Sequence, residues 1–334
     1  MSPRLIRAAV VGVGEFGRNH VRVWRETEGA ELVGIVDTNP ERSERIAREF
    51  DTRVLPNTAA LTAERVDAVS LAVPTKQHAS IGCRLLEAGH DVLVEKPIAA
   101  SVDEADALAD AAKRGGRILQ VGHVERFNPA VAAAQKIVTR PMFFEVHRLG
   151  LFTPRSLDID VVYDVMIHDL DILLALVSGE IVDLKAVGIP VVTDKVDIAH
   201  ARIEFATGAV ANLTASRVST ERVRKMRFFQ EHEYISIDFT RQDVLRIQVK
   251  PGAREAAILD GQPEIGFEKL PTVPEEPLKA EIRSFSECVR ARQGPLVDAA
   301  AGRRALRLAD RVMEGILEHA RRVQIGVFTP QETG

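Results

Sequence analysis

Three side chains in this sequence have the types and spacing for acid–base chemistry beside a cation. Lys96 ends an apolar run, in the tripeptide Glu95-Lys96-Pro97, and Asp164 and His168 lie four residues apart in a later apolar stretch. On a helix this spacing puts both side chains on one face, where a carboxylate can orient an imidazole and stabilise its protonated form. We therefore take them as candidate catalytic groups, with a buried structural histidine as the alternative for His168.

A strand end must position Lys96. Residues 1–123 alternate short β-branched runs with segments of helical period, which predicts an N-terminal Rossmann domain, a doubly wound parallel sheet. Such sheets bind ligands beyond the carboxyl ends of their strands, so Lys96 should face a ligand. The alternative is a surface lysine, but Pro97 restricts the backbone of Lys96. The expected strands are Ile6–Val11, Glu31–Val36, Arg53–Leu55, Ala68–Ala72, Asp91–Val94 and Arg117–Val121.

A helix over Val161–Val177 must position Asp164 and His168. It lies within residues 124–334, where long alternating segments predict a C-terminal α+β domain with a large, mainly antiparallel open sheet. Pro251–Pro274 is expected to be its least structured stretch. The strands are expected at Met142–Leu149, Leu184–Val192, Asp197–Phe205, Ala209–Arg217, Lys225–Gln230, Glu233–Phe239 and Val244–Val249, and further helices at Pro129–Val138, Glu276–Arg292 and Asp298–Arg322.

The turn Gly12-Val13-Gly14-Glu15-Phe16-Gly17 follows the first strand and opens a helix, the context that a dinucleotide fingerprint requires. Gly12 permits the turn, Gly14 lets the backbone approach a pyrophosphate, and Gly17 lets the helix pack on the sheet. Glu15 and Phe16 lie in the same turn. The motif predicts a bound dinucleotide.

Asp37 ends the second strand about 20 residues past Gly17, where a carboxylate can accept ribose hydroxyls and repel a 2′-phosphate. This favours NAD, with NADP less favoured, although Arg42 is near. Asp37 could also cap the helix that starts near Pro40. Val73, Pro74 and Thr75 are expected along the nicotinamide half, where His78 would contact a ribose or cap its helix.

These motifs, in this order, resemble the Gfo/Idh/MocA family of nicotinamide-dependent sugar oxidoreductases over nearly the whole chain. The matching segments are Gly12–Gly17, Glu95-Lys96-Pro97 and the Asp-x-x-x-His helix of Asp164 and His168. The resemblance implies that His168 is the general base and that Lys96 contacts both the reacting hydroxyl and the cofactor. It also implies that Glu95 contacts the cofactor and that Asp164 positions Lys96 and His168. The sequence departs from the family at 158–163, Asp-Ile-Asp-Val-Val-Tyr, where glycines are common.

The segments 122–129 and 163–171 are most similar to the branch that oxidises the 3-hydroxyl of UDP-N-acetylglucosamine to a 3-keto sugar for later transamination. A diphosphate in that substrate would require polar groups, for which Arg126 and Asn128 are the candidates, with Arg148 or Arg155 as further cations. Asp169 and Asp171 are expected at the surface or as loop supports. The alternatives are a polyol or aldose dehydrogenase and a non-catalytic NAD-binding regulator.

Composition limits the possible partners. The chain has 334 residues, which suits two domains, and its net charge of −4 provides no basic field for nucleic acid. The chain has no apolar run of about 18 residues, so no membrane span is predicted. Cys83 and Cys288 give neither a disulfide framework nor a zinc pattern, and the histidines lack metal-ligand spacing, so no metal is expected. The N-terminus lacks a secretory signal, which predicts a cytoplasmic protein. The broad C-terminal sheet predicts a homo-dimer or homo-tetramer.

Overall fold

The computed structural model describes residues 4–153, 158–249 and 265–324. The chain forms two compact units. The first consists of residues 1–127 and 275–306, and the second of residues 128–274 and 307–334. The division expected after residue 123 placed 275–306 in the second domain, whereas in the structure this segment returns to the first.

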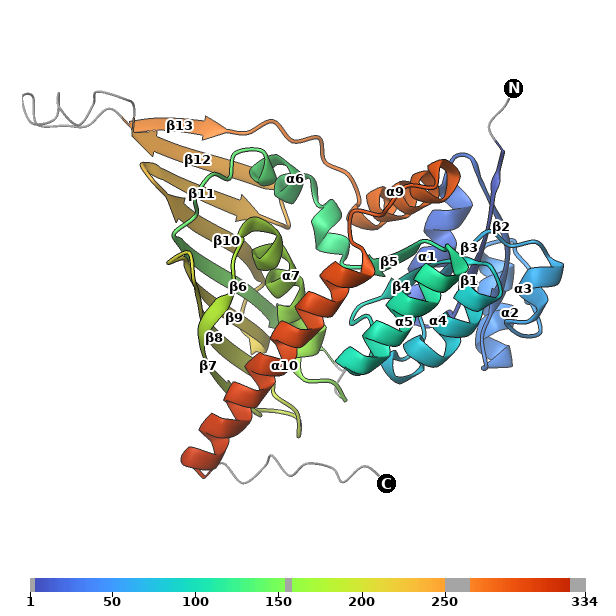
Figure 1. Cartoon of the computed structure of the whole chain (residues 1–334), viewed down its shortest axis with the longest axis horizontal. Helices are drawn as coiled ribbons and strands as arrows, with labels where there is room; N and C mark the ends of the chain where they lie inside the picture. Colours follow the sequence, from blue (N-terminus) through green and yellow to red (C-terminus); the bar gives the residue numbers. More distant parts are fainter. Residues whose placement is uncertain (1–3, 154–157, 250–264, 325–334) are drawn as a thin grey trace, which may run out of the picture. The chain divides into compact units, whose positions relative to one another are not determined.

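The first unit is built on a five-stranded parallel sheet of order β2-β1-β3-β4-β5 (Figure 1). The predicted Rossmann architecture is confirmed. Its strands are β1 (Ile6–Val11), β2 (Ala30–Val36), β3 (Ala68–Leu71), β4 (Asp91–Glu95) and β5 (Leu119–Gly122). Its helices are α1 (Glu15–Glu26), α2 (Pro40–Glu49), α3 (Ala60–Ala63), α4 (His78–Glu87), α5 (Val102–Gly115) and α9 (Pro277–Ala291), with short 3₁₀ turns η1 (Thr75–Gln77) and η2 (Val124–Phe127).

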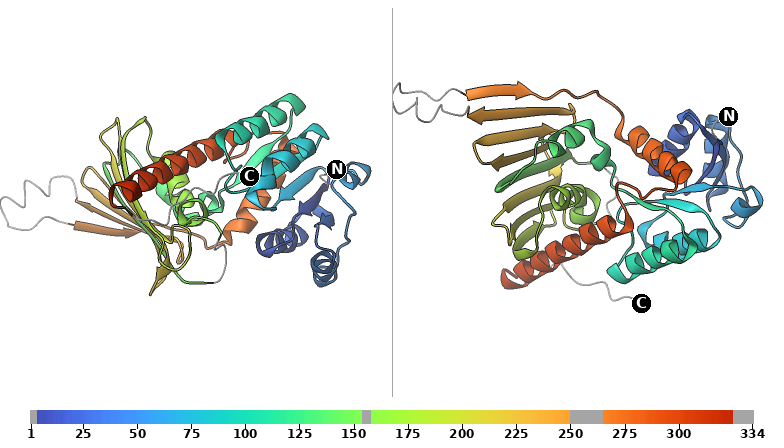
Figure 2. Two further views of the ribbon diagram at one scale, coloured as in Figure 1. Left: turned by 90° about the horizontal axis from the view of Figure 1, so that it is seen from below. Right: turned by 45° about the horizontal axis from the view of Figure 1, so that its top comes forward.

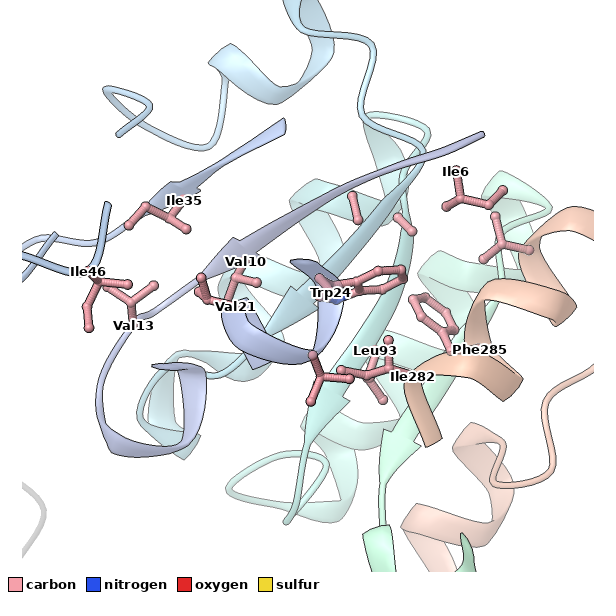
Figure 3. Close-up of a cluster of buried hydrophobic side chains, with 14 of the residues drawn as sticks. Ile6, Val10, Val13, Val21, Trp24, Ile35, Ile46, Leu93, Ile282 and Phe285 are labelled. Atoms are coloured by element: carbon pink, nitrogen blue, oxygen red, sulfur yellow. The ribbon is translucent and has the colours of Figure 1, made fainter. Parts of the chain in front are cut away.

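Helices cover both faces of this sheet, because successive strand residues point to opposite sides. Ser70 accepts a hydrogen bond of 2.8 Å from Trp24 Nε1 of α1, whereas its neighbour Leu71 lies near α4 at Gly82. On the α1 face, Trp24 meets Phe285 of α9 edge to face, with ring centroids 6.2 Å apart (Figure 3). This apolar contact explains why the return segment belongs to the first unit.

One expected strand does not form. Around Arg53–Leu55 only a single bridge exists, between Ile35 and Val54, although Ile35 exchanges backbone hydrogen bonds of 2.9 and 2.8 Å with Arg53 and Leu55. Pro56 follows directly and has no amide hydrogen to extend a ladder. The parallel sheet therefore has five strands in the described part of the chain.

The second unit is built on an eight-stranded sheet of order β13-β12-β11-β10-β6-β9-β8-β7. All neighbours are antiparallel except β6 and β9, so the expected mainly antiparallel sheet is confirmed. Its strands are β6 (Phe143–Leu151), β7 (Ile181–Ile189), β8 (Ile198–Phe205), β9 (Val210–Ser219), β10 (Val223–Gln230), β11 (Glu233–Asp238), β12 (Asp243–Val249) and β13 (Ile265–Lys269). Strand β13 lies inside Pro251–Pro274, where the sequence predicted no regular element; residues 251–264 of that stretch lie outside the described residues.

Three helical elements lie over one face of the second sheet (Figures 1 and 2). They are α6 (Pro129–Gln135), the π-helical turn η3 (Val162–Met166) continued by α7 (Ile167–Leu176), and the later part of α10 (Ala299–Arg322). Gly315 of α10 packs against Ala186 of β7, where an added Cβ would come within 3.3 Å. The helix expected over Val161–Val177 thus forms, but its first turn is not α-helical.

Candidate functional site

The glycine turn between β1 and α1 has the backbone that the fingerprint predicted. Gly12 has φ of +84°, and a Cβ there would come 2.6 Å from the carbonyl oxygen of Ala72. A Cβ on Gly17 would lie 1.8 Å from the carbonyl oxygen of Gly12, so the helix can start this close to the strand only without a side chain. At Gly14 a Cβ would meet nothing within 4 Å. Gly14 therefore leaves open space beside the N-terminus of α1, where a phosphate would approach the helix amides.

Asp37 closes the other side of this turn. Its Oδ2 accepts a hydrogen bond of 2.8 Å from the amide of Val13, and its Oδ1 accepts one of 2.8 Å from the amide of Asn39. Arg42 also donates to Oδ1, with Nη2 at 3.0 Å. The helix α2 is capped by Asn39, whose side chain accepts from the amide of Arg42, and not by Asp37. The structure thus places a carboxylate and a guanidinium together where β2 ends.

Glu95 and Lys96 lie next to the first turns of α1. Glu95 Oε1 lies 2.9 Å from Nε2 of His20, and Glu95 Oε2 accepts from the amide of Lys96 at 3.2 Å. Lys96 Nζ is 5.9 Å from the ring centroid of Phe16, within the range of a cation–π contact. The first unit therefore brings the predicted lysine to the predicted glycine turn.

The Glu95 carboxyl is held in its charged form. Burial acts to raise its pKa, but the hydrogen bond and charge of His20, followed by the charge of Lys96, outweigh burial and lower the pKa. Gly122 lies opposite Glu95 in the sheet, and a Cβ there would meet Glu95 Oε1 at 3.0 Å. A glycine on β5 thus leaves room for the glutamate side chain.

The remaining predicted cofactor contacts follow β3. Val73, Pro74 and Thr75 form the loop into η1, and each is partly or fully exposed. His78 is buried, with Nε2 2.9 Å from the carbonyl oxygen of Val73 and Nδ1 2.9 Å from that of Pro97. Burial lowers the pKa of His78, against the raising effect of both carbonyls. His78 therefore ties the loop after β3 to the turn after β4.

Asp164 and His168 belong to the second unit. Asp164 lies in the π turn and His168 in the first turn of α7, and both are partly exposed. The amide of Ile167 bonds to the carbonyl of Val162, five residues earlier, so one extra residue interrupts the α-helical pattern between them. Asp164 and His168 are four residues apart, but the backbone between them is not a regular α-helix.

The expected phosphate-binding residues have mixed positions. Asn128 is buried and caps α6: its Oδ1 accepts from the amide of Ala130 at 3.1 Å, and its Nδ2 donates to the carbonyl of Phe239 at 3.0 Å. Arg126 is partly exposed in η2. Arg148 is buried in a bidentate pair with Asp169, at 2.7 and 2.8 Å.

The surface positions expected for Asp169 and Asp171 are wrong, because both are buried. Arg155 lies outside the described residues. The role of Arg148 as a further phosphate-binding cation is also not favoured by its position, because its guanidinium is engaged with Asp169.

Two buried groups of the first unit were missed. His20 sits on α1 and Glu281 on α9, and both are almost fully buried. His20 follows Phe16 by one helical turn, a spacing that links it to the glycine turn. The sequence signal for burial of Glu281 was a glutamate on the apolar face of an amphipathic helix. Among the described residues, no group of three or more His, Cys, Asp or Glu could hold a metal ion.

Residues 6–123 match the family described as "Oxidoreductase family, NAD-binding Rossmann fold", and residues 147–236 match the "GFO/IDH/MocA C-terminal domain". The chain is 40% identical over 305 residues to UDP-N-acetylglucosamine 3-dehydrogenase of Acidithiobacillus ferrooxidans, covering 91% of this chain and 95% of that protein. The chain belongs to the Gfo/Idh/MocA family. It is therefore an oxidoreductase with a nicotinamide-dinucleotide-binding domain.

A further relative is less similar in sequence. The scyllo-inositol 2-dehydrogenase (NAD(+)) of Bacillus subtilis is 28% identical over 312 residues, covering 87% of this chain and 88% of that enzyme. Among solved structures, GnnA, the UDP-N-acetylglucosamine 3-dehydrogenase from Acidithiobacillus ferrooxidans, superposes with a TM-score of 0.84 at 38% identity, covering 93% of this chain and 97% of that one. A levoglucosan dehydrogenase in complex with NADH and levoglucosan has a TM-score of 0.83 at 20% identity, which shows a shared fold.

Proposed function

We propose that the protein oxidises the 3-hydroxyl of UDP-N-acetylglucosamine with NAD, giving a 3-keto sugar that a transaminase can use in lipid A or surface polysaccharide synthesis. The observation that carries the proposal is the likeness over 91% of the chain to a UDP-N-acetylglucosamine 3-dehydrogenase. The contact between Lys96 and Phe16 of the glycine turn supports it, because it puts a cation beside the turn that would hold the cofactor.

The residues of the first unit fit a dinucleotide. Open space at Gly14 suits a pyrophosphate at the N-terminus of α1, and Asp37 suits the ribose hydroxyls. NAD would be held by Gly12 to Gly17, Asp37, Val73 to Thr75 and the Glu95-Lys96 turn. When bound, it would accept a hydride from the sugar carbon. We propose NAD over NADP because the Asp37 carboxylate repels a 2′-phosphate, although Arg42 partly neutralises it.

The protein's own groups would manage the proton and the developing charge. His168 takes the hydroxyl proton while the carbon–oxygen bond becomes a carbonyl, and Asp164 orients the imidazole. Lys96, as a cation beside the oxygen, stabilises the developing alkoxide. Arg126 is proposed to contact the diphosphate. Asn128 is proposed to affect substrate binding indirectly, because its side chain caps α6.

The test is a substrate screen. The protein is incubated with NAD or NADP and with UDP-N-acetylglucosamine, UDP-N-acetylgalactosamine, UDP-glucose, free N-acetylglucosamine or myo-inositol, and reduced cofactor is followed by absorbance. Hydroxylamine is added as a trap, because it removes a keto product. In a parallel sample, borodeuteride reduction marks the oxidised carbon, which NMR then assigns. We expect turnover with UDP-N-acetylglucosamine and NAD, and deuterium at C3.

The alternatives give different results in the same screen. Faster turnover of inositol or a free sugar than of any UDP-sugar would make the protein a polyol or aldose dehydrogenase. Binding of NAD without turnover of any compound would make it a non-catalytic regulator. Deuterium at another carbon would retain the substrate class but move the reaction to a different hydroxyl.

We further propose that two or four copies assemble through the second sheet. The face that carries α6, α7 and α10 is buried, whereas alternate residues on the opposite face are partly exposed. Phe143, Phe229 and Tyr234 form an aromatic patch there, with centroids 5.7 and 5.1 Å apart. Light scattering should give a dimer or tetramer, and a monomer would refute the assembly. None of the described helices is long and apolar enough to cross a membrane; a cytoplasmic location remains our prediction.

A further inference from the structure

The segment before Asp164, residues 158–163, contains no glycine and leads into an irregular helical turn. Val162–Met166 forms a π turn in which the amide of Ile167 bonds to the carbonyl of Val162. Such a turn is less stable than α-helix and persists where surrounding contacts hold it. Asp164 lies at its centre, so whatever holds the turn also sets the direction of the Asp164 side chain.

One anchor holds the start of the turn. The amide of Val161 donates to the carbonyl of Val196 at 2.9 Å, and the amide of Val196 donates to Asp160 Oδ1 at 2.8 Å. The carbonyl of Asp160 in turn accepts from the amides of Tyr163 and Asp164, at 3.0 and 3.1 Å. The backbone entering the π turn is therefore fixed to the loop before β8.

A second anchor comes from a side chain inside the turn. The hydroxyl of Tyr163 donates to Asp310 Oδ1 at 2.7 Å, which joins the turn to α10. Burial, followed by this hydrogen bond, raises the pKa of Tyr163, so the phenol keeps its proton and remains the donor. Tyr163 immediately precedes Asp164 in sequence, so this bond fixes the residue next to the candidate catalytic carboxylate.

We propose that Tyr163 and Asp310 are positioning residues of the reaction, which hold the π turn so that Asp164 keeps the orientation it needs beside His168. The inference rests on the proposed function of Asp164 and His168. It assigns Tyr163 a role: its hydrogen bond to Asp310 of α10 gives the π turn one fixed shape.

The experiment compares three variants with the wild type. Tyr163→Phe keeps the ring and removes the donor, and Asp310→Ala removes the acceptor. Asp310→Asn keeps an acceptor oxygen for the phenol. We expect Tyr163→Phe and Asp310→Ala to lower kcat about 10- to 100-fold, as a small misplacement of a catalytic group does, while the KM for the sugar and the Kd for NAD stay within about 2-fold. Asp310→Asn should restore most of the activity.

The matched control uses an exposed position on the same helix. Glu318→Gln changes an exposed carboxylate of α10 and should behave as the wild type. Unchanged kcat in Tyr163→Phe and Asp310→Ala would overturn the proposal. A joint loss of kcat, NAD affinity and Tm would also overturn it, because that pattern indicates general support of the fold.

A second readout does not depend on turnover. Hydrogen exchange followed by mass spectrometry should show faster exchange in Tyr163→Phe for amides of residues 162–167, with the glycine turn unchanged. If the wild type oxidises no sugar but this exchange pattern appears, the proposed function fails while the anchoring of the turn stands. If the wild type turns over and exchange in 162–167 is unaffected, the positioning role fails alone.

Discussion

His20 and Glu95 form a buried pair that joins α1 to the end of β4: Nε2 and Oε1 lie 2.9 Å apart, and the side chains are 2% and 14% exposed. Glu281, on α9, carries a second buried carboxyl whose pKa is raised, first by burial and then by the charge of Glu95. Glu95 has hydrogen-bond donors, whereas no partner of the Glu281 oxygens is found among the described residues. The charge therefore resides on Glu95 and the proton on Glu281.

Compared with the wild type, Glu281→Gln should become more stable as the pH rises. A carboxyl whose folded pKa lies above its unfolded pKa makes the wild type lose stability as pH rises from the unfolded to the folded value. Glutamine cannot ionise, so the variant should gain on the wild type across that range and show no such gain at pH below the unfolded value. Urea unfolding from acidic to mildly alkaline pH measures this, with exposed Glu287→Gln on the same helix as the control. Equal pH dependence of wild type and Glu281→Gln would contradict the assignment.

Gly14→Ala and Gly17→Ala should separate cofactor binding from folding. A Cβ on Gly17 would lie 1.8 Å from a backbone oxygen, so this variant should not reach the native fold. A Cβ on Gly14 meets no protein atom within 4 Å and the backbone φ is −63°, so its Tm should stay near that of the wild type. The methyl group would occupy the space of a pyrophosphate, and NAD affinity should fall at least about 10-fold. Tight NAD binding by Gly14→Ala, measured by calorimetry, would place the pyrophosphate elsewhere.

Asp37→Asn should weaken the preference for NAD. The variant removes a negative charge and leaves Arg42 without its partner, so NADP affinity should rise about 10-fold while NAD affinity falls. Arg42→Ala should lower the affinity for NADP, because the Asp37 charge is then unopposed. Arg45→Ala, an exposed arginine on the same helix, is the control. Fluorescence titration with NADH and NADPH gives both constants, and an unchanged ratio in Asp37→Asn would remove Asp37 from cofactor choice.

Lys96→Ala and His168→Ala should both lose turnover, and His168→Ala should keep the cofactor. We expect kcat/KM to fall at least about 100-fold in each, as for other groups that stabilise charge or transfer a proton in a transition state. The Kd for NAD should change little in His168→Ala. Lys76→Ala, an exposed lysine on η1, should match the wild type. A variant of either residue with full activity would exclude it from the chemistry.

The local patterns predicted most of the first unit. The glycine turn, the Rossmann sheet and the position of Glu95-Lys96 at the end of β4 follow from short-range rules: backbone space at glycine, period in the helices, and ligand sites at strand ends. The strand expected at Arg53–Leu55 is only a single bridge between Ile35 and Val54, because Pro56 has no amide hydrogen to extend the ladder. Strand β13 was missed because its pairing with β12 cannot be seen in its own few residues.

The sequence by itself determined the family, the fold class of both halves and the three residues proposed for the chemistry. Each of these can be recognised from short local patterns in the chain. Only the tertiary structure decided that residues 275–306 return to the first unit, that Glu281 lies buried near the charge of Glu95, and that Tyr163 bonds to Asp310. These partners are far apart in sequence, and no local periodicity encodes them. Charge state and side-chain direction depend on burial and on hydrogen-bond partners, and both exist only once the chain has folded.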